Sequence, residues 1–233
     1  MNKIFPLVDS LIAQIKETEM DSVEKAAELI ANSIIDGGIL QAFGAGHSNA
    51  GALELTHRAG GFIPSKNIKE PAGGVYESIE GVGTSFMKKV DVRPEDVVVI
   101  ISNSGRNPLP VEIAAGAKAK GAKIIAVTAL EASKQLKSRH SSGKNLYELA
   151  DVILDNKVPL GDSAIDLDGA DAKVCGTSTI TTSILLQALT YRAAELMVEK
   201  GHRPPIYKSQ NIDGGREYNE ALEAKYIDRL YRI

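Results

Sequence analysis

Two short segments of the chain combine the hydroxyl, amide and glycine residues that are typical of phosphate binding. The first reads Gly44-Ala45-Gly46-His47-Ser48-Asn49 and the second reads Ser102-Asn103-Ser104-Gly105-Arg106-Asn107. Each follows an apolar run and precedes a predicted helix, where free backbone N–H groups favour an anion. In the second segment, serine and asparagine side chains add donors that could surround a phosphate monoester. The alternative is that these residues only cap helices and form turns.

A third polar segment, Gly176-Thr177-Ser178-Thr179, opens a long predicted helix beside Cys175. Serine and threonine are common helix caps, so Ser178 or Thr179 as a plain cap is the simpler explanation for this segment alone. The segment becomes a candidate for ligand binding only in combination with the other two.

Other ligand classes lack their sequence patterns. Asn49 stands where a dinucleotide fingerprint has its third glycine, and no phosphate loop of the nucleoside triphosphatase type is present. The acids of residues 161–169 do not follow the order of a calcium loop, so we expect a solvated β-hairpin or a lid there. The histidines are scattered without the spacing of zinc ligands. We therefore expect no metal and no cofactor.

The elements that must position these segments follow from the apolar pattern. Four short runs rich in β-branched residues show no polar alternation, as expected for strands buried on both faces: 39–43, 97–101, 124–127 and 152–154. Helical spacing is found at 4–15, 21–34, 49–59, 75–89, 108–120 and 179–200. This alternation predicts a three-layer α/β/α sandwich with a parallel sheet. In such sheets ligands bind at the carboxyl ends of the strands, where two of the polar segments lie.

We expect one compact unit, because no linker of biased composition divides the chain. Residues 1–36 are predicted to form N-terminal helices, and residues 37–201 form the α/β domain that carries the polar segments. Residues 202–233 form a C-terminal tail and helix, packed on the surface or against another subunit.

The composition excludes several classes of protein. The 233 residues are 43% hydrophobic and 24% charged, which is typical of a globular protein and excludes disordered and fibrous chains. The net charge of -3 and the lack of a basic run exclude nucleic acid as a main partner. A single cysteine favours a reducing cytoplasm. No signal peptide and no run of 18 apolar residues is present, so we expect no membrane partner.

The order of these motifs resembles the sugar isomerase (SIS) domain family of phosphosugar isomerases and phosphosugar-binding proteins. The resemblance rests on Ser48 in a glycine-rich loop, on Ser-x-Ser-Gly-x-Asn after a central strand, and on Gly-Ala-Lys-Ile-Ile-Ala-Val-Thr at 121–128. The Cys-Gly-Thr-Ser-Thr segment is similar to a further family position, and the resemblance covers about residues 22–201. It implies a flavodoxin-like parallel sheet, a sugar-phosphate ligand, and a homodimer or homotetramer with sites near subunit contacts.

The resemblance implies ligand-binding residues in all three polar segments. It assigns the phosphate to Ser102, Ser104 and Asn107, with Ser48 and Asn49 nearby and Thr177, Ser178 and Thr179 on the far side. Gly46, His47 and Asn103 belong to the same loops and complete the predicted binding set.

Glu54 and His57 are the candidate catalytic residues. An aldose-ketose isomerisation needs a base that moves a proton between adjacent carbons and a group that helps to open the sugar ring. The two residues are predicted to face the same side of one helix, and an imidazole with an unperturbed pKa of about 6.5 suits proton transfer. Ala52-Leu53-Glu54 also resembles the isomerase half of glucosamine-6-phosphate synthase. His47 is a further candidate for carrying a proton.

Two functions of different class stay open at the level of sequence. The first is an isomerase of a phosphorylated sugar or amino sugar, with an etherase-like lyase as its variant. The second is a module that senses a sugar phosphate without turnover. Phosphoheptose isomerases and N-acetylmuramic acid 6-phosphate etherases carry a glutamate ten residues after the loop serine, whereas this chain has Arg58 there. That departure favours the second function, in which Glu54 is a surface charge and His57 a structural residue.

Overall fold

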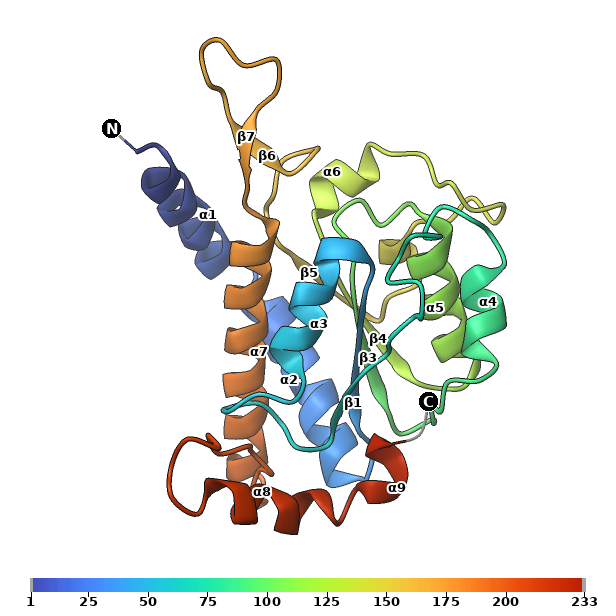
Figure 1. The fold of residues 1–233 in the computed structure, drawn as a ribbon, viewed down its shortest axis with the longest axis vertical. Coiled ribbons are helices and arrows are strands. Elements are labelled where there is room, and N and C mark those ends of the chain that lie inside the picture. The colour runs from blue at the N-terminus through green and yellow to red at the C-terminus, as the bar shows by residue number, and fades with distance from the viewer. Residues whose placement is uncertain (1, 232–233) are drawn as a thin grey trace.

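A five-stranded parallel sheet forms the centre of the computed structural model, which describes residues 2–231 (Figure 1). In spatial order the strands are β2 (Ser65–Asn67), β1 (Leu40–Gly44), β3 (Val97–Ile101), β4 (Lys123–Thr128) and β5 (Val152–Asp155). Every residue of β1 and β3 is buried, because helices cover both faces of the sheet. The predicted three-layer α/β/α sandwich is confirmed.

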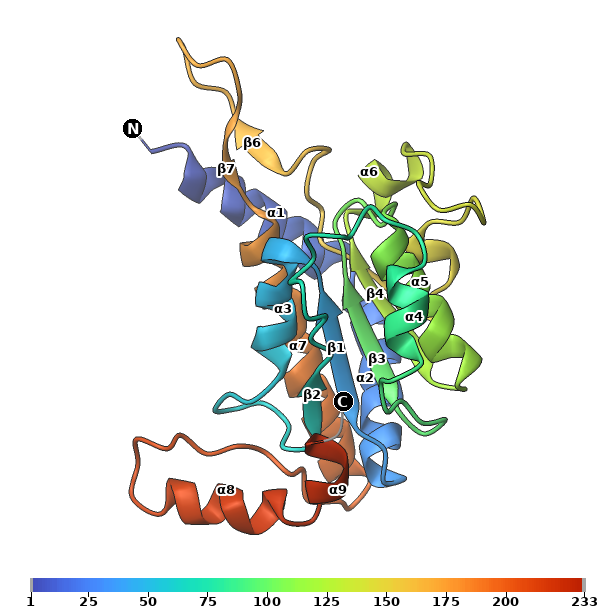
Figure 2. The ribbon, with the colours of Figure 1, turned by 45° about the vertical axis from the view of Figure 1, so that its right-hand side comes forward.

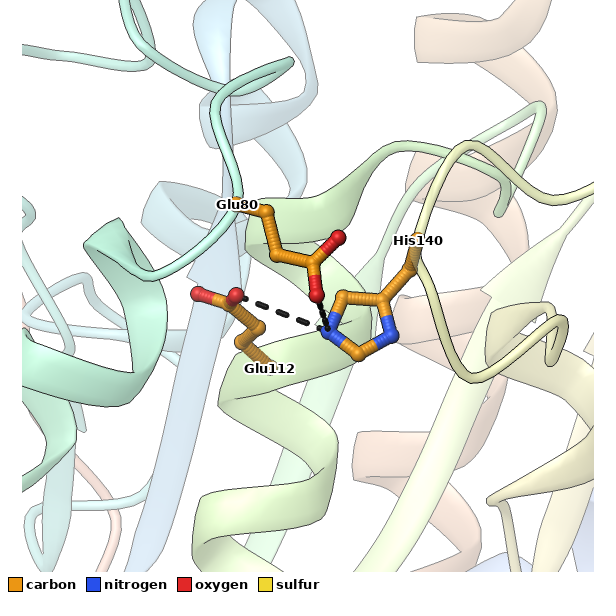
Figure 3. A group of neighbouring side chains, drawn as sticks. All are labelled: Glu80, Glu112 and His140. Carbon is orange, nitrogen blue, oxygen red and sulfur yellow. Dashed lines mark ion pairs between the residues drawn. The ribbon is translucent and has the colours of Figure 1, made fainter.

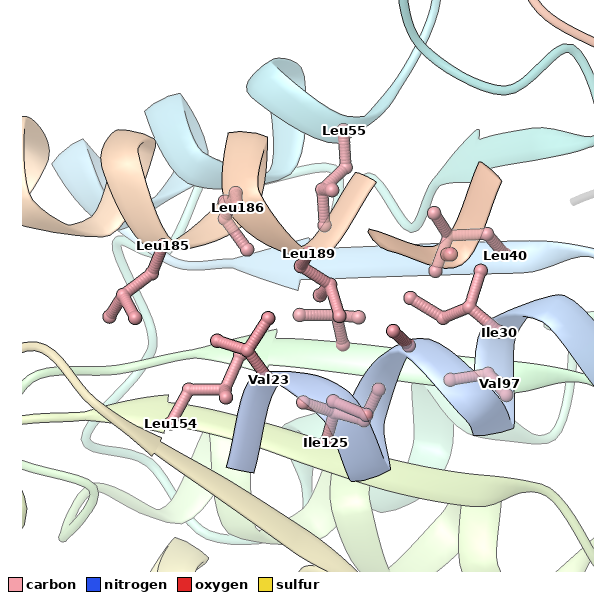
Figure 4. Close-up of a cluster of buried hydrophobic side chains, with 14 of the residues drawn as sticks. Val23, Ile30, Leu40, Leu55, Val97, Ile125, Leu154, Leu185, Leu186 and Leu189 are labelled. Carbon is pink, nitrogen blue, oxygen red and sulfur yellow. The ribbon is translucent and has the colours of Figure 1, made fainter. Parts of the chain in front are cut away.

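The larger core lies on the face of the sheet that is covered by α2 (Met20–Ile35), α3 (Asn49–Leu55) and α7 (Ser178–Glu199). Leucines of α3 and α7 meet Val23 and Ile30 of α2 above the apolar strand residues (Figure 4). The preceding helix, α1 (Ile4–Thr18), contributes Ile15 to this core and extends away from the sheet (Figure 1). The two N-terminal helices predicted from the sequence are therefore present.

The opposite face of the sheet is covered by α4 (Val82–Met87) and α5 (Pro108–Ala119). Ile113 of α5 and Met87 of α4 pack in one cluster with Val98 and Ile100 of β3. Pro108 occupies the start of α5, as expected for a residue without a backbone N–H group. These contacts fix the first turn of α5 directly after the second polar loop.

The remaining elements lie at the two ends of the sheet. An antiparallel hairpin of β6 (Ser163–Ile165) and β7 (Val174–Gly176) projects from the molecule near α1, which confirms the predicted hairpin (Figure 1). Above the sheet, α6 (Leu130–Lys134) follows β4, and below it α8 (Gly215–Glu223) and α9 (Ile227–Leu230) end the chain (Figure 2). Within residues 2–231, none of the helices is long and apolar enough to cross a bilayer.

Two helices are shorter than the sequence pattern predicted, and one strand was not predicted. The helix expected at 49–59 ends at Leu55, because Thr56 is extended and His57 has a φ of 53°. The helix expected at 75–89 begins only at Val82, since glycines with positive φ turn the chain before it. The strand β2 reads Ser-Lys-Asn, a polar sequence that does not indicate a buried strand.

A buried carboxylate joins the C-terminal helix to the amino end of the sheet. Asp96 has no exposed surface and accepts hydrogen bonds from Ile39 N at 3.0 Å and Gln41 Nε2 at 2.9 Å. Arg229 of α9, only 7% exposed, completes the group with its Nη2 at 2.6 Å from Asp96 Oδ2. Because both charges are removed from water, each needs the other as its partner.

We predict that Arg229→Leu lowers the free energy of unfolding by about 3–5 kcal/mol, because it leaves the Asp96 carboxylate buried without its cation. Urea denaturation measures the change. The control is Arg216→Leu, since Arg216 forms an exposed ion pair with Glu220 and its loss is expected to cost less than about 1 kcal/mol. Equal effects of the two substitutions would contradict the structural importance of the buried pair.

Candidate functional site

A cleft of about 350 Å³ lies at the carboxyl ends of β1 and β3. Seven of the predicted binding residues line it, namely Gly46, His47, Ser48, Ser102, Asn103, Ser104 and Asn107. The two strands pair in parallel and end at the same level, with Gly44 opposite Ile101, so the loops that follow them are neighbours. The two polar segments recognised in the sequence therefore meet in one cavity.

The first loop turns tightly at Gly44. A Cβ atom at this position would lie 2.3 Å from Ser48 O, so no larger residue fits without moving the loop. The segment around Gly74 packs closely on the same loop, where Gly46 N donates a hydrogen bond of 3.2 Å to Gly73 O. Glycine is required at position 74, since its φ is 90° and a Cβ atom would approach Gly46 N to 2.7 Å. These close contacts fix His47 and Ser48 at the rim of the cleft.

The second loop is held by its own hydrogen bonds and by β4. Ser102 Oγ accepts a hydrogen bond from Gly105 N at 3.2 Å, and Ser104 O accepts one from Ser133 Oγ at 2.7 Å. Asn103 is fixed through its carbonyl oxygen, which accepts from Thr128 Oγ1 at 2.9 Å. The loop is thus preorganised around the cavity.

Asn107 connects the second loop to two charged residues. Its Nδ2 donates a hydrogen bond of 2.7 Å to Glu77 Oε1, and its Oδ1 accepts one of 3.1 Å from Arg139 Nη1. Asn107 also directly precedes α5, whose N-terminus carries a partial positive charge. Arg139 does not line the cleft, but it places a positive charge in direct contact with Asn107, which does.

The other predicted binding residues lie outside the lining of this cleft. Asn49 borders a neighbouring cavity, and its Oδ1 accepts a hydrogen bond of 3.0 Å from Asn67 Nδ2. Thr177 and Ser178 are buried at the start of α7, and Thr179 is exposed. The link between α7 and the cleft is Asp162, which lines the cleft and accepts hydrogen bonds from the backbone N–H groups of Thr177 and Ser178.

Glu54 and His57, the predicted catalytic residues, also do not line the cleft. Glu54 is on α3, where its carboxylate forms an ion pair with Arg58 and accepts a hydrogen bond from Gln187 of α7. His57 follows the end of that helix, with Nδ1 3.4 Å from Tyr207 Oη. Partial burial lowers the pKa of His57 from its usual value, because it favours the uncharged form of the ring. The prediction that both residues lie on one face of a helix is wrong, because α3 ends before His57.

Two acidic residues of the cleft, Glu77 and Asp162, were not predicted as site residues from the sequence. Glu77 lies in the glycine-rich turns before α4, and its place depends on how those turns pack on the first loop. Asp162 has a φ of 66° and lies 3.7 Å from His47 Nε2. The sequence signal for Asp162 was the acidic run at 161–169, which was interpreted only as a hairpin or a lid.

Within residues 2–231, one side-chain group has the spacing of metal ligands: Glu80, Glu112 and His140 (Figure 3). His140 Nε2 lies 3.5 Å from a carboxylate oxygen of each glutamate. The Glu112 carboxylate already accepts hydrogen bonds from two backbone N–H groups at the start of α4. Glu80 in turn accepts from the backbone and the hydroxyl of Ser141. These contacts favour a structural role, in which the group fastens the loop of His140 to α4 and α5.

Comparison with known proteins agrees with this architecture. The SIS domain family model matches residues 5–129. A UPF0309 protein of Listeria monocytogenes is 53% identical over 229 residues, which cover 98% of each chain. A UPF0309 protein of Geobacillus thermodenitrificans is 38% identical over 239 residues, covering 99% of this chain and 96% of the relative.

Solved structures show the same fold at low sequence identity. A phosphoheptose isomerase of Francisella tularensis superposes with a TM-score of 0.59 at 16% identity, covering 83% of this chain and 96% of its own. A phosphoheptose isomerase of Neisseria gonorrhoeae gives a TM-score of 0.55 at 16% identity, covering 82% and 95%. The resemblance inferred from the sequence motifs is confirmed, and the chain belongs to the SIS domain family, together with its UPF0309 relatives.

Proposed function

We propose that the protein binds a phosphorylated sugar or amino sugar in the cleft and isomerises it between aldose and ketose forms. The observation that carries this proposal is the meeting of two polar loops around one cavity at the carboxyl ends of β1 and β3. Membership of the SIS domain family supports the same class of ligand. A cytoplasmic location, with no cofactor and no nucleic acid partner, belongs to the same proposal.

The phosphate group is proposed to lie on the second loop, against the start of α5. Ser102, Ser104 and Asn107 offer hydroxyl and amide groups there, beside the N-terminus of a helix of 12 residues. Because the lining of the cleft includes no lysine or arginine among the described residues, hydrogen bonds supply the main attraction, and Arg139 adds a positive charge through Asn107. Such a site holds an anion without a metal ion.

The sugar is proposed to extend toward His47, Glu77 and Asp162, which line the same cleft. A carboxylate within reach of the sugar carbons is the group that an isomerase needs to move a proton. Glu54 and His57 remain the alternative candidates for the catalytic residues. Because neither lines this cleft, they would have to act at another one, such as the cleft of a second subunit.

A homo-oligomer is part of the proposal, because α7 carries an exposed apolar stripe. Ile180, Tyr191 and Val198 are exposed and share one side of the helix, since their spacings of 11 and 7 residues are close to whole numbers of turns. Leu53 of the adjacent α3 is also half exposed. Light scattering after size-exclusion chromatography measures the molar mass, which we expect to be that of two or more chains. The mass of a single chain at micromolar concentration would contradict the proposed homo-oligomer.

A sensing module without turnover is the second candidate function. It is favoured by Arg58 and by the contacts of Glu54, whose carboxylate is occupied by Arg58 and Gln187. An etherase-like lyase of an amino-sugar phosphate is a variant of the first function. A thermal-shift screen of sugar phosphates, followed by a turnover assay with the ligand that binds, separates these possibilities.

We predict that Ser104→Ala weakens binding of the most stabilising sugar phosphate from that screen by about tenfold to 150-fold, because loss of a hydrogen bond to an ionised group costs about 1.5–3 kcal/mol. Isothermal titration calorimetry measures the affinity. The control is Ser10→Ala on the exposed side of α1, which should leave the affinity unchanged. Unaltered binding by Ser104→Ala would exclude the second loop as the phosphate site.

We predict that Glu77→Gln lowers kcat by about 100-fold to 10,000-fold while the ligand still binds, because glutamine keeps an oxygen for Asn107 but cannot act as a base. The matched variant is Glu54→Gln, with the same chemical change on α3. Loss of turnover by Glu54→Gln alone would reverse the assignment and support catalysis by Glu54. Normal turnover by both variants would exclude both glutamates.

A further inference from the structure

A second cavity, of about 260 Å³, lies at the β2 edge of the sheet. It shares no lining residue with the cleft at the carboxyl ends of β1 and β3. Its apolar wall consists of Ile68, Phe86, Val90 and Leu230, which come from the end of β2, from α4 and the segment after it, and from α9. Figure 2 shows β2 and α9 side by side. The sugar-phosphate cleft uses none of its lining residues, although one of them, His57, is an alternative catalytic candidate.

Lys66 is the unusual residue of this cavity. It lies in β2 opposite Gln41 of β1, and its side chain is only 7% exposed. Its Nζ atom is buried and has no hydrogen-bond partner among residues 2–231. A buried ammonium group without a partner is unfavourable, and burial accordingly lowers the pKa of Lys66 from its usual value.

The acids near Lys66 are already engaged by other cations. Asp91 forms ion pairs with Arg93 at 3.2 Å and with Arg229 at 3.4 Å. Asp96 accepts from Arg229 and from backbone and amide N–H groups, as described above. The more distant Glu95 also faces Arg229, at 3.7 Å. Arginines thus contact these carboxylates directly, and the charges of Asp91 and Asp96 reach Lys66 only from beyond ion-pair distance among residues 2–231.

A second lysine adds to the positive charge of the cavity, whereas burial lowers the pKa of His57 and favours its neutral form. Lys69 and His57 line it together with Lys66 and Asn67. No acidic side chain of the described chain is part of the lining. A ligand that complements this cavity therefore needs a negative charge for Lys66 and an apolar body for the wall of Phe86 and Val90.

We propose that the cavity binds a small organic carboxylate, with its carboxylate group at Lys66 and its hydrocarbon part against Phe86, Val90 and Leu230. A carboxylate fits better than a phosphate, because a monoanion matches one buried ammonium group and most of the wall is apolar. This site is independent of the sugar-phosphate cleft. It makes the protein a receptor for two chemically different ligands.

Hexanoate serves as the probe, with hexan-1-ol and hexylamine as neutral and cationic compounds of the same chain length. We expect hexanoate to shift the backbone amide signals of Lys66, Ile68 and Val90 in ¹H–¹⁵N spectra of the full chain, and the two other compounds to bind at least tenfold more weakly. Shifts confined to other residues, or equal binding of hexan-1-ol, would overturn the proposal.

We predict that Lys66→Met weakens hexanoate binding at least tenfold, because the methionine fills similar space without the charge. The control is Lys25→Met, the same change at an exposed position of α2 on the opposite face of the sheet. Undiminished binding by Lys66→Met would refute the role of this lysine. The variant is expected to fold, since it removes an unpaired buried cation. If it does not fold, the spectra of the unmodified protein decide the question.

Sugar-phosphate binding distinguishes the failure of this proposal from that of the proposed function. We expect Lys66→Met to bind the sugar phosphate of the screen as the unmodified protein does, because Lys66 is absent from the lining of the cleft. Loss of hexanoate binding with intact sugar-phosphate binding supports two separate sites. Loss of both ligands in a folded variant would contradict their independence.

Discussion

The parallel pairing of β1 with β3 is the constraint on which the rest of the structure depends. The register sets Phe43 opposite Ile100 and Gly44 opposite Ile101, so both strands end at one level. Their side chains are buried between two helical layers, and Gln41 is the one polar side chain within the two strands. The candidate ligand-binding groups lie at one end of the sheet. There the register of β1 and β3 brings serines that are far apart in the sequence into a single cavity.

The features predicted well from the sequence are those that depend on local pattern. The apolar runs at 97–101 and 124–127 fall inside β3 and β4, and the serine loop after β3 lines the cleft. Features that depend on packing between distant segments were missed. Glu77 lines the cleft because the turns that carry it pack on the first loop. The residues of β2 are polar, and the strand is buried because of the segments that pack around it, which its own sequence does not indicate. His57 leaves the predicted helix at a positive φ that no spacing rule indicates.

The long helix α7 shapes the cleft although its own side chains are absent from the lining. Asn156 has no exposed surface and donates hydrogen bonds to Asn103 at 2.7 Å and to Thr182 of α7 at 3.2 Å. Asp162 binds the backbone at the start of the same helix. Because α7 also carries Leu185 and Leu189 of the larger core, the packing of that core and the shape of the cleft are coupled through these two polar contacts.

The ion pair of Asp96 with Arg229 has a consequence for synthesis of the protein. The two residues are 133 positions apart, so a ribosome delivers the carboxylate long before its cation. During that interval Asp96 has N–H donors but no counter-charge, and the amino end of the sheet lacks its final anchor. We therefore expect a partial chain that lacks Arg229 to be less stable than the full chain. We expect such partial chains to be cleaved by proteases more readily than the full chain, because they unfold more often.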